Sequence, residues 1–166
     1  MFQSCKSLGK LEIGYFNTDN VTNMSFMFSY CQSLTSLNLH NFNTENISDM
    51  QSMFHGCTKL ENLDISNFDT CNVLNMEYMF SLCENLKVLD ITNFDTRNVT
   101  NMKSMFRFCS NLNTIYVSKK WSTNNLTESE GMFSYCKNLK GAISYEANKT
   151  DATYANFETG YLTYKE

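Results

Sequence analysis

Residues 79–104 read MFSLCENLKVLDITNFDTRNVTNMKS, and this stretch decides the fold because the chain repeats it. Met-Phe pairs begin at residues 1, 27, 53, 79, 105 and 132, so the spacing is 26 residues four times and then 27. All ten methionines and six of the seven cysteines fall in fixed slots of this unit. One such unit cannot bury its own apolar side chains, whereas stacked units cover one another. The sequence therefore predicts a stack of similar coils.

The unit also predicts its own secondary structure. It reads M-F-x-x-C-x-x-L-x-x-L-x-[LI]-x-x-F-x-T-x-N-V-x-x-M-x-x, and its central part matches the core of a leucine-rich repeat. Alternation at 37–40 predicts a strand, and such strands from successive units are expected to pair into one long parallel sheet. We expect an α/β repeat fold: a right-handed leucine-rich-repeat solenoid with parallel strands on one face and short strands or helical turns on the other.

Two regions follow from the repeat. Residues 1–139 form the predicted array, with units starting at 1, 27, 53, 79, 105 and 132, and residues 140–166 form a predicted C-terminal cap rich in tyrosine. The chain begins inside a unit, with core residues at Met1 and Phe2. We therefore expect upstream sequence, a partner or a second copy to cover that end, and end-to-end self-association through it is one expectation.

Composition excludes several classes of protein. The net charge is −4 and the pI about 5.2, so the basic surplus of a nucleic-acid-binding protein is missing. No run of 18 apolar residues is present, which predicts no membrane insertion, and no secretory signal is visible at the amino terminus.

The cysteine slot has three interpretations: core thiols, disulfides between neighbouring coils, or a metal site. The close C-x-x-C pairs of structural zinc sites are missing, and unpaired cysteine behaves as a small buried hydrophobe, so we favour core thiols. Cys71 lies outside the slot and is expected near the surface, where it could crosslink two chains. His55 precedes Cys57 by two residues, but an inward-facing thiol does not suit a nucleophile.

Acidic residues recur in two columns, at Asp64 and Asp90 and at Asp69 and Asp95. Carboxylates stacked at strand spacing repel one another unless a cation lies between them, so a calcium ladder is one interpretation. Asparagine replaces aspartate in both columns, which favours a hydrophilic face without a metal. We predict no cofactor.

The unit resembles the repeats of BspA-like leucine-rich-repeat surface proteins of bacteria, a family that also includes mycoplasma lipoproteins. Residues 64–70 (DISNFDT) and 90–96 (DITNFDT) are close matches, and residues 149–161 are similar to the segment that often ends such arrays. The resemblance implies an extracellular or cell-surface protein that binds partners. It supplies no catalytic residues to transfer to this chain.

These observations predict a non-enzymatic recognition module that binds a protein or a glycan, in an adhesion-type role. The binding face is expected to be the sheet, where two columns of side chains point outward. The candidate residues are Glu12, Asn38, His40, Asp64, Ser66, Asp90, Thr92, Tyr116 and Ser118. The alternative is a structural spacer or stalk in a larger surface protein. An enzyme is the weakest interpretation, because the one irregular stretch, residues 119–131, has no nucleophile–base pair.

Overall fold

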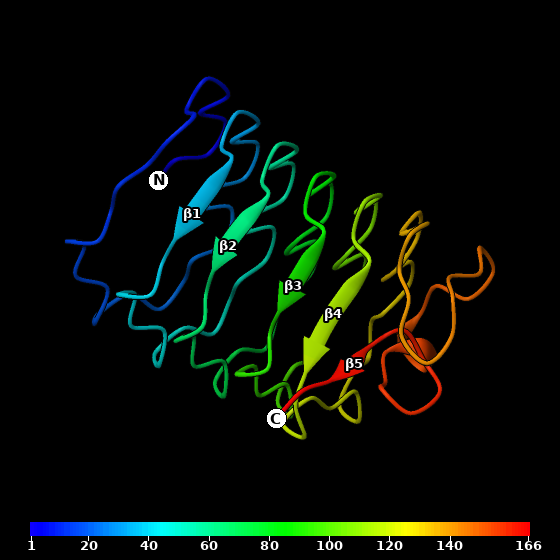
Figure 1. The fold of residues 1–166 in the computed structure, drawn as a ribbon. Coiled ribbons are helices and arrows are strands. Elements are labelled where there is room, and N and C mark those ends of the chain that lie inside the picture. Colours follow the sequence, from blue (N-terminus) through cyan, green and yellow to red (C-terminus); the bar gives the residue numbers. More distant parts are fainter.

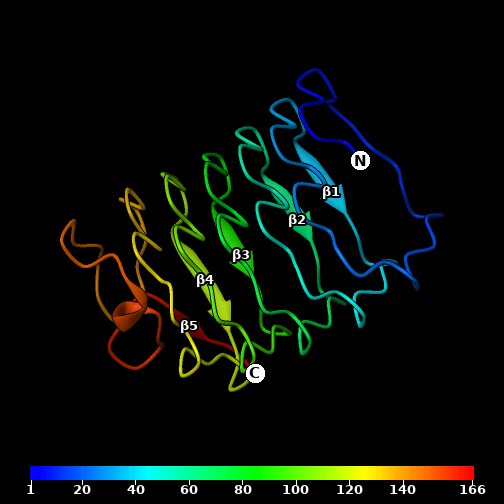
Figure 2. The ribbon, with the colours of Figure 1, turned by 180° about the vertical axis from the view of Figure 1, so that it is seen from behind.

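The computed structural model describes residues 1–166 as a row of similar coils lying side by side (Figure 1). One short strand from each central coil lies on one side of the row. These strands are β1 (Ser36–Asn38), β2 (Asn62–Asp64), β3 (Val88–Asp90) and β4 (Thr114–Val117), and β5 (Thr163–Tyr164) follows from the C-terminal segment. We call the outward side of β1 to β5 the sheet face. The same row is visible from behind in Figure 2.

The strands are parallel because each coil places its strand next to the same strand of the next coil. Leu37 lies opposite Leu63, and Leu89 lies opposite Ile115. These central side chains point into the molecule, while their neighbours on each strand point outward, as alternation along a strand requires. The leucine period thus sets the register.

On the opposite side, single bridges replace strands. They link Asn23 to Asp49, Asp49 to Asn75, Asn75 to Asn101 and Asn101 to Glu128, all in parallel. A run of tight turns follows each bridge, and within it every second amide donates to a carbonyl of the next coil, such as Phe28 N–H to the Met53 carbonyl at 2.9 Å. Backbone hydrogen bonds therefore join the coils on this side as well.

The core consists of ladders of identical side chains. Phe28, Phe54, Phe80 and Phe106 stack nearly in parallel, with ring centroids 5.6–5.8 Å apart. Offset stacking at this spacing is a favourable arrangement of aromatic rings. At the C-terminal end, the rings of Phe133 and Tyr161 meet edge to face.

The cysteine slot faces this core. Five of its six thiols are buried, and each donates to the carbonyl of the phenylalanine 29 or 30 residues earlier, such as Cys83 Sγ to the Phe54 carbonyl at 3.3 Å. All seven cysteines are free. The expectation of core thiols is confirmed for these five, but Cys5, in the first coil, is exposed.

Polar ladders close each bend below the sheet. Thr44 donates from its hydroxyl to the Asp69 carbonyl and accepts from the Asp69 amide, both at 2.8 Å, and Thr70 does the same with Asp95 at 3.0 and 2.8 Å. Asn72 donates from its side-chain amide to the Glu45 carbonyl at 2.8 Å. Buried backbone groups need such partners, so these columns explain the recurring Thr-x-Asn.

The expectation of one long sheet was wrong. β2 and β3 do not pair, so the strands form two sheets, β1–β2 and β3–β4–β5. In the register of the other strands, Asp90 would lie directly opposite Asp64, and two like charges in that position repel. At the paired junctions, Asp64 faces Asn38 and Asp90 faces Tyr116. On the other side, the bridge from Asn75 to Asn101 still joins these two coils.

The first coil also departs from expectation, because the predicted strand around Glu12 is not formed. Backbone pairing on the sheet face begins at Ser36.

The C-terminal segment lies against the last coil. β5 takes the place beside β4 that the strand of a further coil would take, pairing Tyr116 with Thr163. The short 3₁₀ helix η1 (Ala152–Tyr154) precedes it, and the Trp121 indole N–H donates to the Ala155 carbonyl at 2.9 Å. Apolar side chains of this segment thus cover the end of the core.

Candidate functional site

The two predicted columns lie beside each other and are hydrogen-bonded within each coil. The Asp64 carboxylate accepts from the Ser66 amide at 3.1 Å and from its hydroxyl at 2.7 Å. Asp90 accepts from Thr92 at 3.1 and 2.8 Å in the same way. Such side-chain acceptors close a turn at the end of a strand. Each carboxylate is thereby fixed in direction.

The Asn38 side chain also accepts from the residue two positions on: the His40 amide donates to its carbonyl oxygen at 3.0 Å. A ring nitrogen of His40, Nδ1, lies 2.7 Å from the same oxygen. The turn therefore accepts asparagine or aspartate at this position.

Electrostatics keep both aspartates charged. Hydrogen bonds from the Ser66 hydroxyl and amide lower the pKa of Asp64. Burial raises the pKa of Asp90, but hydrogen bonds from Lys165 and Thr92 outweigh that effect and leave the pKa below its ordinary value. At neutral pH this part of the sheet face therefore carries two carboxylates on neighbouring, unpaired strands.

The C-terminal segment places a positive charge, Lys165, beside Asp90 on the sheet face. Lys165 Nζ lies 2.5 Å from a carboxylate oxygen of Asp90 and 5.2 Å from the centre of the Tyr116 ring. The three residues come from β3, β4 and the segment after β5. Sequence reasoning missed this cluster because 75 residues separate Lys165 from Asp90 and no periodic pattern links them.

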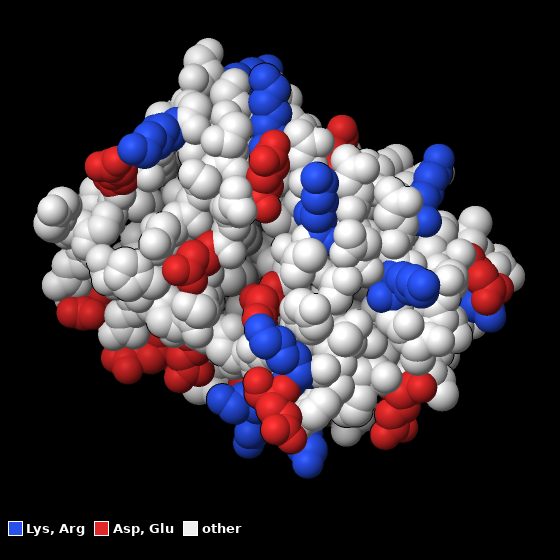
Figure 3. Space-filling model, in the orientation of Figure 1, with Lys and Arg blue, Asp and Glu red and all other residues white.

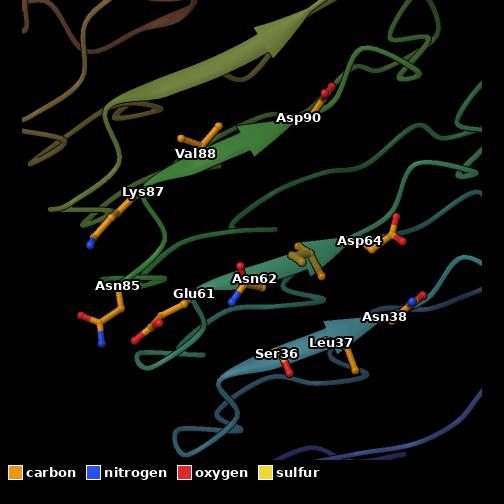
Figure 4. Close-up of a pocket in the computed structure, with 11 residues that line it drawn as sticks. Ser36, Leu37, Asn38, Glu61, Asn62, Asp64, Asn85, Lys87, Val88 and Asp90 are labelled. Atoms are coloured by element: carbon orange, nitrogen blue, oxygen red, sulfur yellow. The ribbon is translucent and has the colours of Figure 1, made fainter.

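A hollow lies on the sheet face where β2 and β3 separate, with a volume of about 690 Å³ (Figure 4). Glu61, Asn85 and Lys87 gather at one end, and Asp64 and Asp90 lie toward the other. The lining also includes Ser36, Asn38, Asn62 and Val88. This size is within the range of small-ligand sites, although the lining is more polar than is usual for them.

The structure brings some predicted residues together and separates others. Asn38, Asp64 and Asp90 line the hollow, and Ser66 and Thr92 line a smaller neighbouring one with the two aspartates. His40 lies near Glu12 at another depression, where Glu12 pairs with Lys10 at 2.7 Å. Tyr116 and Ser118 are half-buried and lie outside the hollow.

Sequence reasoning missed the residues at the other end of the hollow, Glu61, Asn85 and Lys87. They precede the strands, where the repeat varies from copy to copy and the pattern gives no signal. Val88 and Asn62 could have been found, because they are outward strand positions two residues before Asp90 and Asp64. Figure 3 shows acidic and basic side chains interspersed over this side of the molecule.

The thiols and histidines offer no reactive arrangement. Burial raises the pKa of Cys57 and Cys136 to about 12. A reactive cysteine needs the opposite shift, toward a stable thiolate. His55 Nε2 lies 3.0 Å from the Tyr30 hydroxyl, and burial lowers the pKa of this histidine. No three His, Cys, Asp or Glu side chains are grouped so that they could hold a metal ion.

Comparison with known proteins agrees with the repeat. The profile of the family described as "Mycoplasma protein of unknown function, DUF285" matches residues 1–88 and again residues 61–161. The chain belongs to this family. DUF285 proteins are repeat-containing and related to BspA-like surface proteins, so membership supports a surface-protein family in general terms. No curated protein and no solved structure matches this DUF285 chain. None of its helices has the length and apolar character needed to cross a membrane.

Proposed function

We propose that this DUF285 protein is a non-enzymatic recognition module, secreted or displayed at the cell surface in the manner of BspA-like proteins. We propose further that its coils form a right-handed leucine-rich-repeat solenoid. The sheet face then binds a protein or glycan partner in an adhesion-type role. Two observations support this proposal: the family membership, and charged side chains that hydrogen bonds hold in their turns. Backbone hydrogen bonds also join neighbouring coils both along the strands and on the opposite side.

The observation that carries it is the hollow between β2 and β3. It spans β1, β2 and β3, includes the place where β2 and β3 do not pair, and has amide, carboxylate and ammonium groups around it. Such a lining offers both donors and acceptors of hydrogen bonds to a polar ligand. Asp64 and Asp90 are already held by hydrogen bonds within their turns, so these two side chains lose little freedom when a partner binds.

A binding screen tests the proposal. The folded chain is applied to a glycan array and to a panel of extracellular-matrix proteins, alongside a Lys87→Ala, Asn62→Ala double variant. Both residues line the hollow and are exposed, so the variant should fold normally and lose at least tenfold in affinity for any partner found. Lys137→Ala is the matched control, because Lys137 is exposed and lies outside the hollow.

Two outcomes would contradict the proposal. Binding that survives the double variant would place the partner elsewhere on the molecule. Failure of the folded wild type to bind on both panels would favour the alternative function, a rigid spacer within a longer surface protein.

A further inference from the structure

The run of turns opposite the strands contains an unusual backbone feature. In each complete coil, the residue before Met-Phe and the residue before the ladder cysteine have positive φ. These residues are Ser4, Phe26, Tyr30, Ser52, Gly56, Tyr78, Leu82, Ser104, Phe108, Gly131 and Tyr135. Glycine adopts this conformation without strain, whereas bulky residues rarely do.

Aromatic residues nevertheless occupy many of these positions, and several are exposed. Phe26, Tyr30 and Tyr135 are exposed by 37%, 39% and 49%. Gly56 and Gly131 occupy the same positions in other coils, so the turn itself does not need a ring. A ring here costs stability twice, through backbone strain and through exposed apolar surface, and strained residues concentrate at functional sites.

One group of these residues surrounds a slot. Phe26 and Tyr78 occupy the same position two coils apart, and the small Ser52 lies between them. Since adjacent coils bring equivalent rings within 5.6–5.8 Å in the core, the serine between Phe26 and Tyr78 leaves the middle position of this row without a ring. The Tyr30 ring leans over Gly56, where a Cβ would lie 2.7 Å from its Cδ1.

His55 forms part of the slot between two tyrosines. Its ring centre lies 4.9 Å from that of Tyr30 and 5.8 Å from that of Tyr78, both edge to face. No acidic or basic side chain other than His55 lines the slot. Burial lowers the pKa of His55, so its ring is neutral at pH 7. A charged ligand would therefore find no opposite charge there.

Two polar atoms beside the slot have no hydrogen-bond partner. They are His55 Nδ1 and the hydroxyl of Ser29, a fully buried residue that lines the slot. A buried polar atom without a partner costs free energy, which a ligand hydroxyl would recover. The slot thus combines aromatic walls with neutral polar groups.

We propose that this slot binds one pyranose ring of a glycan. The C–H groups of the sugar pack against the rings of Phe26 and Tyr78 on either side of it, and its hydroxyls bond to the neutral polar groups around Ser52 and His55. A quaternary ammonium ion would favour a nearby carboxylate, and an aromatic side chain of a protein would leave the polar atoms unpaired. This site is separate from the hollow on the sheet face, and either can fail without the other.

Saturation-transfer NMR with methyl glycosides of glucose, galactose, mannose and N-acetylglucosamine tests the slot. At least one glycoside should bind the full chain, with a dissociation constant on the order of 1 mM for so small a ligand. Tyr78→Gly should weaken that binding at least tenfold. Because Tyr78 has φ of 54°, glycine also relieves backbone strain, and the variant should melt within a few degrees of the wild type.

Leu82→Gly is the matched control, because Leu82 has φ of 61° in the same run of turns and does not line the slot. It should leave glycoside binding unchanged. A second variant, Ser52→Phe, fills the slot from its centre and should abolish binding. The proposal is overturned if no glycoside binds the folded wild type, if binding survives both Tyr78→Gly and Ser52→Phe, or if tetramethylammonium or N-acetylphenylalanine amide binds in place of the sugars.

Discussion

At the scale of single residues, the ladder thiols link stability to alkaline pH. Burial raises the pKa of Cys57 from 9.0 to about 12, and burial acts the same way on Cys83 and Cys109. Above pH 9 the unfolded chain loses thiol protons that the folded chain retains, so it binds fewer protons. The contribution of these thiols is full below pH 9 and is lost as the pH rises toward 12. We expect the urea midpoint of the wild type to fall steadily between pH 9 and 11. The midpoint of a Cys57→Ala, Cys83→Ala variant, compared with its own value at pH 7, should fall less over the same range.

Shape matters at the same sites. Cys83→Ser replaces a large sulfur atom, which fills space and donates to the Phe54 carbonyl, by a smaller and more strongly hydrated hydroxyl. Burying that hydroxyl should cost about 1 kcal/mol of unfolding free energy, measured by urea denaturation at pH 7. Cys71→Ser is the control, because Cys71 is only half-buried and should change stability little. Equal stability of the two variants would show that the sulfur does not contribute to packing.

At this scale the sequence predicted burial well and backbone conformation poorly. The fixed slot of Cys57 and Cys83 identified core thiols, because few surfaces need an identical residue in every copy. The positive φ of Tyr30 or Tyr78 left no such signal, since glycine occupies the equivalent position only at Gly56 and Gly131. The identity of a residue indicates which φ it prefers, and tyrosine prefers a negative φ. Here hydrogen bonds between the turns of neighbouring coils, such as Tyr30 N–H to the His55 carbonyl, override that preference.

At the scale of elements, we attribute the separation of β2 from β3 to repulsion between the carboxylates of Asp64 and Asp90. We predict that Asp64→Asn allows these strands to pair, because an amide removes the repulsion from Asp90 and still accepts from the Ser66 amide, as Asn38 does from His40. The gain should be about 0.5 kcal/mol. Amide hydrogen exchange should slow at Leu63 and Ile65, whose N–H groups would then point toward β3.

The reverse substitution is the matched test. Asn38→Asp places a carboxylate opposite Asp64 on two strands that are paired. We expect exchange to quicken at the amides of Leu37 and Leu39 and the unfolding free energy to fall by a similar amount. If neither variant alters exchange on the sheet face, charge repulsion is not the cause of the break.

The sequence could have predicted this break but not the ion pair beside it. Asp64 and Asp90 share one column, so their repulsion was visible in the spacing, yet the leucine pattern alone favoured a continuous sheet. Lys165 joins Asp90 only because β5 lies beside β4 in three dimensions. Residues 140–166 do not follow the repeat, so the repeat gives no register from which their contacts could be predicted.

At the scale of the whole molecule, each coil is joined mainly to its neighbours, so stability is close to a sum of coil and interface contributions. Tyr161 forms the last aromatic layer: its fully buried ring meets Phe133 at 5.3 Å, and its hydroxyl accepts from the Glu146 amide at 3.0 Å. Tyr161→Ala should therefore remove about 3 kcal/mol, as large-to-small aromatic substitutions in cores do.

The position of that loss distinguishes an end effect from a general one. Because coupling passes from coil to coil, Tyr161→Ala should speed amide exchange most in the coil of Phe133 and progressively less toward Phe54, whereas a cooperative globule would lose protection evenly. Tyr164→Ala is the control: Tyr164 is 38% exposed, so its removal should cost much less and leave the gradient unchanged. A uniform rise in exchange over residues 24–139 after Tyr161→Ala would mean that the coils unfold as one unit, and the stack would then owe its stability to the array as a whole.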